Sequence, residues 1–413
     1  MTQTAAGQVS KERLWHRLML MARHGATPAG GVNRQALSAE DVAARRELIE
    51  WGIALGLSAH TDPAGNLFLR LEGRDRAAPP VLSGSHLDSQ PNGGKFDGVY
   101  GVVAALEAVQ AIKESGQSLS RAIEIVAWMN EEGSRFAPGM MGSSAYAGAA
   151  ALADMLPVRD ADGVSVAEAL KQLENAFPSL PQRALGRPVA AYVEAHIEQG
   201  PLLEREGYSV GVVTGMQGKR TFRVAIKGES AHAGTSCRAE RKDALLAATA
   251  VIQALAAALH DQEDIVKFTV GRLDIKPNAP SVVAGEAVFS IDLRHPHATT
   301  LRLLGDKVRE ICVVTAQPCA VEVEELVSAV PLEFPVSMRD RVRDAAAGLG
   351  IKTMDLLSAA GHDSRYLHEI CPTGMIFVPC KDGVSHNEAE SATPEDLYEG
   401  TRVLAQTLAA LAR

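Results

Sequence analysis

The sequence has 413 residues, with 41 Lys and Arg against 50 Asp and Glu and a formal net charge of -9. This length allows two or three domains with substantial hydrophobic cores and excludes a minimal fold that needs disulfides or metals to stay folded. The acidic balance excludes an overall positive field of the kind that binds nucleic acid or anionic membranes. We therefore expect a globular protein with no nucleic-acid or membrane partner.

The five cysteines are odd in number and show no CxxC spacing, which favours free thiols in a reducing compartment. The N-terminal segment carries Lys and Arg within its only apolar stretch, unlike a signal peptide. The longest nearly apolar run, residues 244–259, contains Thr249 and Gln253 and is shorter than the about 20 apolar residues of a membrane span. We expect this run to form a buried helix, and we expect the protein to be cytoplasmic.

Helices and strands alternate along the first half of the chain. Ser38, with Asp41 three residues later, predicts a helix start, and this helix is expected to run to about Leu55. Strands are expected over residues 66–71, 79–84 and 123–129, and a helix is expected over residues 98–112. Apolar strands that alternate with helices predict a mainly parallel sheet covered on both faces.

Polar residues follow two of these strands directly. His86 comes after the strand at 79–84, and the pair Glu131–Glu132 comes after the strand at 123–129. Open α/β sheets bind their ligands at the carboxyl ends of the strands. The sequence therefore places His86 and the Glu pair at one rim of one sheet.

The middle of the chain has a different pattern. An alternating strand at 221–228, an Ala-rich helix at 241–259, strands at 266–273 and 287–293, and a helix at 299–311 form an α+β block. After it, the polar stretch 361–365 and the apolar run 375–378 return to the first pattern. We expect a domain made of residues 1–212 and 330–413, with a second domain inserted over 213–329.

Five residues have side chains that suit divalent metal ions: His86, Asp97, Glu132, His196 and His386. Imidazole and carboxylate together fit two borderline or hard cations, which a shared carboxylate holds about 3.5–4 Å apart. Asp97 suits the shared position because it follows a Gly-Gly turn and precedes Gly98 at a helix start. Taken singly, each residue is more often a surface or core side chain, and their joint occurrence favours a site.

Several stretches are similar, in this order, to the amidase branch of the M20 zinc aminoacylase and carboxypeptidase superfamily. They are EAHIEQG, GESAHAGT, DLRHP, AGHDS and GVSHNEAE, and the resemblance runs from about Leu82 to Glu390. That branch contains N-carbamoyl-L-amino-acid hydrolases, β-ureidopropionases, allantoate amidohydrolases and ureidoglycolate amidohydrolases. The resemblance implies an α/β fold, with a zinc-exopeptidase-like catalytic domain built on a mixed, mainly parallel sheet, and an inserted α+β lid and dimerisation domain.

The resemblance also implies a metal centre with two divalent ions, for which zinc is favoured and manganese, cobalt or nickel are alternatives. It implies that His86 and His196 bind one ion, that Glu132 and His386 bind the other, and that Asp97 bridges them. The metals would lower the pKa of a water, Glu131 would take its proton as general base, and the resulting hydroxide would attack the carbonyl carbon. Asp88, two residues after His86, is expected to orient that imidazole as a hydrogen-bond acceptor.

Further residues match the branch's substrate-contacting positions. His232 in GESAHAGT would stabilise the oxyanion from the other subunit of a homodimer, and Arg294 would bind a substrate carboxylate. The remaining substrate positions are Gln199, Ser281, Gly361 and His362. Ser281 departs from the pattern, since relatives usually present Asn there, so the reaction class is better defined than the substrate.

The leading functional hypothesis is a hydrolase that cleaves an N-carbamoyl L-amino acid to the amino acid, CO2 and ammonia. Hydrolysis of allantoate or ureidoglycolate is the alternative within enzymes. The alternative that is not an enzyme is a catalytically inactive homologue that only binds a small molecule. The complete set of metal ligands together with Glu131 argues against this alternative.

Overall fold

The computed structural model describes residues 4–413, which divide into two compact units. Unit 1 extends to Thr214 and resumes over Phe334–Arg413, whereas unit 2 comprises Gly215–Glu333. Unit 1 thus contains both ends of the described chain, and unit 2 is a single continuous insertion.

Unit 1 is built on a mixed sheet with the strand order β1-β2-β4-β3-β5-β16-β6-β14, and β15 pairs with β6. The central strands are parallel: β3 (Val81–His86) lies between β4 (Ile123–Trp128) and β5 (Ala191–Ile197), which pairs with β16 (Thr373–Val378). The outer strands are antiparallel, and they are β1 (Ser58–Thr61), β2 (Leu67–Leu71), β6 (Val210–Met216) and β14 (Leu332–Glu333), with β15 (Thr353–Ser358) beside β6. All six residues of β3, of β4 and of β16 are buried, as expected for strands covered on both faces. This architecture confirms the predicted α/β class.

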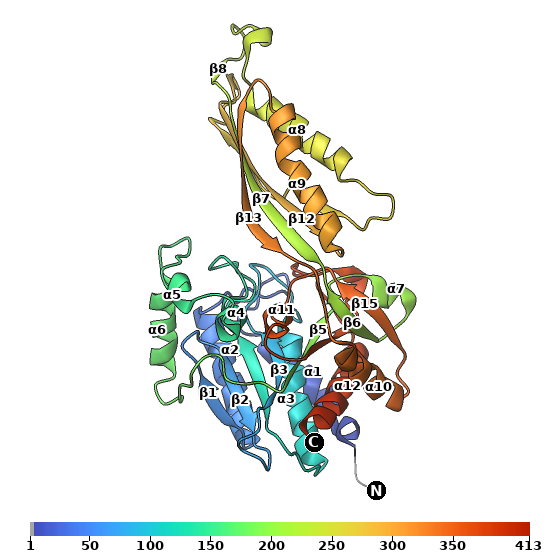
Figure 1. Cartoon of the computed structure of the whole chain (residues 1–413). Coiled ribbons are helices and arrows are strands. Elements are labelled where there is room, and N and C mark those ends of the chain that lie inside the picture. Colours follow the sequence, from blue (N-terminus) through green and yellow to red (C-terminus); the bar gives the residue numbers. More distant parts are fainter. Residues whose placement is uncertain (1–3) are drawn as a thin grey trace. The chain divides into compact units, whose positions relative to one another are not determined.

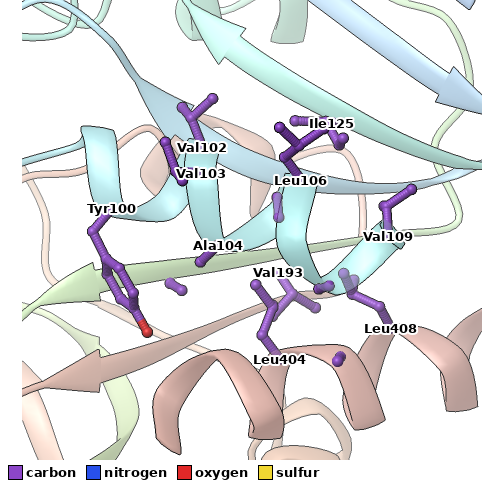
Figure 2. Close-up of a cluster of buried hydrophobic side chains, with 14 of the residues drawn as sticks. Tyr100, Val102, Val103, Ala104, Leu106, Val109, Ile125, Val193, Leu404 and Leu408 are labelled. Carbon is purple, nitrogen blue, oxygen red and sulfur yellow. The ribbon is translucent and has the colours of Figure 1, made fainter. Parts of the chain in front are cut away.

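The core of unit 1 lies between this sheet and its long helices. The helix α3 (Val99–Glu114) is apolar nearly all round because it packs on β3 and β5 with one side and on α12 (Pro394–Ala412) with the other. Figure 2 shows Leu106 of α3 in one cluster with Leu404 and Leu408 of α12. The remaining helices of unit 1 are α1 (Lys11–Met21), α2 (Ala39–Ala54), α4 (Met141–Ala147), α5 (Leu152–Met155), α6 (Val166–Ala176), α7 (Leu202–Glu206), α10 (Val336–Gly348) and α11 (Ser364–Leu367).

Unit 2 is an antiparallel sheet covered on one face by two helices (Figure 1). Its strand order is β10 (Leu273–Lys276), β12 (Glu286–His295), β7 (Gly218–Lys227) and β13 (Ala320–Ala329), and β9 (Lys267–Thr269) also pairs with β12. The helices are α8 (Ala244–Ala258) and α9 (Ala298–Thr315). A short ribbon of β8 (Ala231–His232) and β11 (Val282–Val283) lies beyond one end of this sheet.

Two details of unit 2 differ from the sequence-based expectation. The strand expected over 266–273 is two strands, because β9 pairs with the last part of β12 whereas β10 pairs with its first part. The apolar run 244–259 forms a helix, but only one face of it is buried, and Leu246 is 62% exposed. Within residues 4–413, no helix combines the length and apolarity that crossing a membrane requires.

The core in Figure 2 predicts unequal effects of two Leu substitutions in unit 1. Leu106 is 0% exposed, so Leu106→Ala leaves a cavity and should lower the free energy of unfolding by about 2–5 kcal/mol. Leu202, which is 44% exposed, is the control, and Leu202→Ala should cost less than about 1 kcal/mol. Urea unfolding of the two variants measures the difference, and equal losses would contradict this description of the core.

Candidate metal centre

Three parallel strands bring polar side chains to one rim of the unit 1 sheet. His86 ends β3, where it stands opposite Trp128, the last residue of β4. Glu131 and Glu132 follow β4 within four residues. His196 lies inside β5, one residue before its end, and stands opposite Phe377 of β16. Since these strands run in the same direction, their carboxyl ends collect the four side chains at one edge.

The five candidate ligands form two groups that share one residue. The ligand atoms of His86, Asp97 and His196 lie within 4.8 Å of one another, and so do those of Asp97, Glu132 and His386. Oδ1 of Asp97 is 3.2 Å from Nε2 of His196 and 3.9 Å from Nε2 of His86. Oδ2 of Asp97 is 3.2 Å from Nε2 of His386, which is itself 3.5 Å from Oε2 of Glu132. The two oxygens of one carboxylate therefore face two different groups.

The two buried imidazoles are oriented by main-chain carbonyls. Nδ1 of His86 donates to the carbonyl of Asp88 at 2.8 Å, and Nδ1 of His196 donates to the carbonyl of Ile197 at 2.9 Å. Each ring is thereby held with its Nε2 pointing at Asp97, and this is the atom that would bind a cation. Gly98, at a φ of +65°, leaves room for the His86 ring, since a Cβ there would lie 2.3 Å from it.

The carboxylate of Asp88 has a different partner from the expected one. Its Oδ1 accepts the main-chain N–H of Glu131 at 3.3 Å, and its Oδ2 accepts that of Glu132 at 3.2 Å, whereas Nδ1 of His86 is 3.8 Å away. Burial raises the pKa of Asp88 to about 7, and the Asp41 charge adds to the shift. Asp88 thus orients His86 through its carbonyl and fixes the two glutamates through its carboxylate.

Charges are crowded in this cluster. Burial raises the pKa of Glu132 to about 8, and the Asp97 carboxylate adds to the shift. The hydrogen bond to Asp97 raises the pKa of His386 to about 9. Burial by itself would raise the pKa of Asp97, but its bonds to His196 and His386 hold it well below its usual range. Imidazoles and carboxylates that converge in this way form a donor set that fits two divalent cations.

Glu131 lies beside the first group. Its Oε2 is 3.6 Å from Nε2 of His86, and its side chain is 9% exposed. Burial, followed by the charges of Asp363 and Glu132, raises the pKa of Glu131 well above its usual range. A carboxylate at this position is within reach of a water that the first group would bind.

Three of the expected substrate-contacting residues lie in unit 1. Nε2 of Gln199 donates to Oδ2 of Asp97 at 2.9 Å, and its buried Oε1 has no partner among the described residues. The ring of His362 is 4.4 Å from that of His196, and its Nε2 is 3.0 Å from the Ser358 hydroxyl. Gly361 is exposed in the loop before it.

The other three lie in unit 2. His232 and Ser281 are neighbours on the β8–β11 ribbon, where the N–H of Ala233 donates to the carbonyl of Ser281 at 3.0 Å. Arg294 is on β12, and its Nε and Nη2 donate to the two carboxylate oxygens of Asp292 at 2.8 and 3.2 Å. The structure therefore brings the five candidate ligands together with Glu131 and Gln199, and it places His232, Ser281 and Arg294 in the other unit.

Sequence reasoning missed further residues that contact the candidate ligands, among them Gln90, Glu390 and Ser385. Gln90 donates its main-chain and side-chain N–H groups to Glu132, at 3.1 and 2.8 Å. Glu390 accepts the main-chain N–H groups of Phe96 and Asp97. Glu390 is the last residue of the stretch GVSHNEAE, which is the only sequence signal that could have drawn attention to it.

Comparisons with known proteins agree with this geometry. The family described as Peptidase family M20/M25/M40 matches residues 82–410. An N-carbamoyl-L-amino-acid amidohydrolase of Paenarthrobacter aurescens is 40% identical over 390 residues, covering 93% of this chain and 94% of that protein. An allantoate amidohydrolase of Escherichia coli (strain K12) is 34% identical, covering 95% and 96%. The crystal structure of a hydantoinase/carbamoylase family amidase from Burkholderia vietnamiensis has a TM-score of 0.89 and 40% identity, covering 98% of each chain.

A sheet rim that gathers imidazoles and carboxylates into two groups around one shared Asp is consistent with a hydrolase site for two divalent cations. The chain belongs to the peptidase family M20/M25/M40 and, within it, to the hydantoinase/carbamoylase amidase branch, which confirms the resemblance seen in the sequence.

Two cation sites that share Asp97 predict unequal effects of single substitutions. Asp97→Ala removes an oxygen from both groups and should leave fewer than one Zn²⁺ per chain after dialysis. His386→Ala removes a ligand from one group and should leave about one. Atomic emission measures the metal content, with Asp340→Ala on the surface of α10 as the control. Equal metal contents in the Asp97 and His386 variants would contradict a shared Asp97.

Proposed function

We propose that the chain is a two-metal amidohydrolase that cleaves an N-carbamoyl L-amino acid to the amino acid, CO2 and ammonia. The observation that carries this proposal is the position of Glu131, a buried carboxylate, beside two ligand groups that share Asp97. The relatives named N-carbamoyl-L-amino-acid amidohydrolase, at up to 40% identity over nearly the whole chain, favour this substrate class.

Divalent cations held by the five ligands would acidify a water and polarise the substrate carbonyl. The residues of the chain do the rest. Glu131 accepts the proton of the water on a carboxylate oxygen and later delivers it to the leaving nitrogen. Asp88 makes this possible because its two oxygens hold the consecutive N–H groups of Glu131 and Glu132, so that one side chain faces His86 and the other faces His386.

His232 has a defined tautomer that suits stabilisation of an oxyanion. Its Nδ1 accepts the main-chain N–H groups of Gly234 and Thr235, both at 3.1 Å. The neutral ring therefore carries its proton on Nε2, which is a hydrogen-bond donor. A donor of this kind stabilises the negative charge that develops on the carbonyl oxygen when it is attacked.

Arg294 is proposed to bind the carboxylate of the substrate. Asp292 holds its guanidinium in a fixed orientation, and Lys219 lies 3.1 Å from the same Asp292. A guanidinium fixed in this way offers planar, paired donors to a carboxylate. Ser281 lies next to His232, so its side chain belongs to the His232 end of unit 2 rather than to the Arg294 end.

His232 and Arg294 lie at opposite ends of the unit 2 sheet. Arg294 is opposite Lys219, close to Gly215 where the chain enters the unit, and Glu286 at the other end of β12 is opposite Lys227. Eight residue steps along β12 from Arg294 to Glu286 span about 26 Å. The strand β8, which contains His232, lies beyond one end of the unit 2 sheet (Figure 1). One carbamoyl amino acid cannot contact both residues of one protomer, so we propose a homodimer in which His232 comes from the partner.

Unit 2 has surfaces that suit such a dimer. The strand β13 is at the edge of its sheet, so its outer main-chain groups are available for pairing. Large apolar side chains are exposed on three elements of the unit, with Leu246 on α8 62% exposed, Val314 on α9 70% exposed and Leu326 on β13 55% exposed.

A substrate panel tests the proposed function. Purified protein loaded with Zn²⁺, Mn²⁺ or Co²⁺ should release ammonia from N-carbamoyl L-amino acids with a higher kcat/KM than from allantoate or ureidoglycolate. Glu131→Gln should lower kcat by about 10²–10⁴-fold and keep the metal content, because the amide cannot accept the proton. Glu174→Gln, at an exposed position of α6, is the control. If no substrate of the panel releases ammonia, the proposal is refuted. If allantoate or ureidoglycolate has the higher kcat/KM, that compound and not the N-carbamoyl amino acid is the substrate.

Mixed dimers test the origin of His232. His232→Ala and Glu131→Gln should each be nearly inactive, whereas a purified heterodimer of the two variants contains one site with both native residues. Twofold symmetry then predicts about half of the wild-type activity. His260→Ala, an exposed His of the same unit, is the control and should stay active. Heterodimers as inactive as their parents would contradict the proposal that His232 acts across the dimer.

A further inference from the structure

Glu390 is a buried carboxylate that contacts the loop carrying Asp97. The residue is 2% exposed, and it lies 294 positions along the chain from Phe96. Its Oε1 accepts the main-chain N–H of Phe96 at 2.8 Å and that of Asp97 at 3.2 Å. Its Oε2 accepts the hydroxyl of Ser385 at 2.9 Å. One carboxylate therefore joins the loop before α3 to the loop that carries His386.

Ser385 extends this connection to the side chain of Asp97. Its Oγ is 3.2 Å from Oδ2 of Asp97, the oxygen that faces His386. Nε2 of Gln199 donates to the same Oγ at 3.1 Å. The hydroxyl of Ser385 thus lies between two carboxylates and shares its one hydrogen between them, and Oδ2 of Asp97 also accepts from Gln199 in a different loop.

Gly94 shows that the main chain leaves space for Glu390. A Cβ at position 94 would lie 1.9–2.2 Å from the carboxylate atoms of Glu390, closer than any two unbonded heavy atoms can be. A residue with a side chain at this position would displace that carboxylate. The Gly-Gly turn before Asp97 therefore accommodates a specific acidic side chain from the end of the chain.

We propose that Glu390 and Ser385 are positioning residues that fix Asp97 so that its two oxygens face two separate cations. Glu390 fixes the main chain of residues 96–97, and Ser385 fixes Oδ2. Neither residue is a metal ligand or a substrate contact. This inference rests on the two-metal centre of the proposed function, and we refer to the pair as the Asp97 brace.

The physical reason is the freedom of a carboxylate that bridges. A bridging carboxylate must present each oxygen in a defined direction, and torsions that end in a planar group are broad, so the side chain alone does not fix it. Hydrogen bonds to groups behind a ligand remove this freedom before the cation binds. Loss of such partners typically lowers metal affinity by about 10–100-fold.

The negative charge of Glu390 near two cations is a competing explanation for any effect of this residue on metal affinity. Two substitutions separate the effects. Glu390→Ala and Glu390→Gln both remove the charge, but Gln keeps an oxygen for the N–H groups of Phe96 and Asp97. Its amide then donates to Ser385, whose hydroxyl turns to Asp97. A brace made of hydrogen bonds therefore survives in the Gln variant and is lost in the Ala variant.

Co²⁺ titration of the apo-protein, followed by visible absorption, is the test. Glu390→Ala should weaken Co²⁺ binding by about tenfold or more relative to Glu390→Gln and should change the absorption bands, since these report ligand geometry. Ser385→Ala should weaken binding with no change of charge, and the effects of Ser385→Ala and Glu390→Ala should not be additive, because the two side chains contact each other and both support Asp97. Glu388→Ala is the matched control, because Glu388 lies in the same loop but accepts from Thr27.

Equal Co²⁺ affinities of the Glu390→Ala and Glu390→Gln proteins would overturn the brace in favour of charge alone. Melting of the apo-proteins checks folding, and if Glu390→Ala does not fold, unchanged affinity in Ser385→Ala overturns the brace instead. A wild-type chain that binds fewer than two Co²⁺ would overturn both the metal centre and the brace. A wild-type chain that binds two Co²⁺ but releases no ammonia would refute only the proposed substrate chemistry, and the variant affinities would still decide on the brace.

Discussion

The division of one carboxylate between two groups of ligands is the constraint on which this site depends. Asp97 directs one oxygen to His86 and His196 and the other to His386. Apart from Asp97, the two ligand groups share no residue. A small rotation of this carboxylate would weaken both groups at once. The surrounding structure holds this carboxylate and its neighbours in place. The Asp88 carbonyl accepts from His86, a buried carboxylate accepts the main-chain N–H of Asp97, and the Gln199 amide donates to the Asp97 carboxylate.

The parallel sheet meets this demand by delivering side chains from strands that are buried on both faces. Such strands move little, so His86 and His196 are fixed by the core itself, and only the loops need additional support. Asp88 supports the loop after β4, and Gln90 holds Glu132 in that loop. The same fold thus explains why so many buried acidic groups lie near one another without being ligands.

Much of the fold and of the ligand set could be predicted from the sequence, for a physical reason. His86 is the last residue of β3, and Glu132 lies four positions after Trp128, the end of β4. A change to polar residues at the end of a buried strand is visible in a single sequence. His196 lies inside β5, where both faces are buried and no break marks it, so its residue type made it a candidate but only the resemblance assigned it to a metal. Glu390 and Gln90 were missed because their partners are far away in sequence, which no local pattern records. Glu390 accepts main-chain N–H groups of residues 96–97, and Gln90 donates to the carboxylate of Glu132. The break between β9 and β10 was missed because it reflects where each strand pairs along β12.

The order of these residues along the chain has a consequence for biosynthesis. His386 and Glu390 lie after unit 2 in the sequence, so they leave the ribosome later than the whole insertion. Domains generally fold as units while synthesis proceeds from the N-terminus. The insertion can therefore fold while the sheet of unit 1 still lacks β16, and the second group of ligands is completed only after residue 386 has been synthesised. A truncated chain that stops before residue 386 would retain His86, Asp97 and His196 but would have no complete partner group for the other oxygen of Asp97.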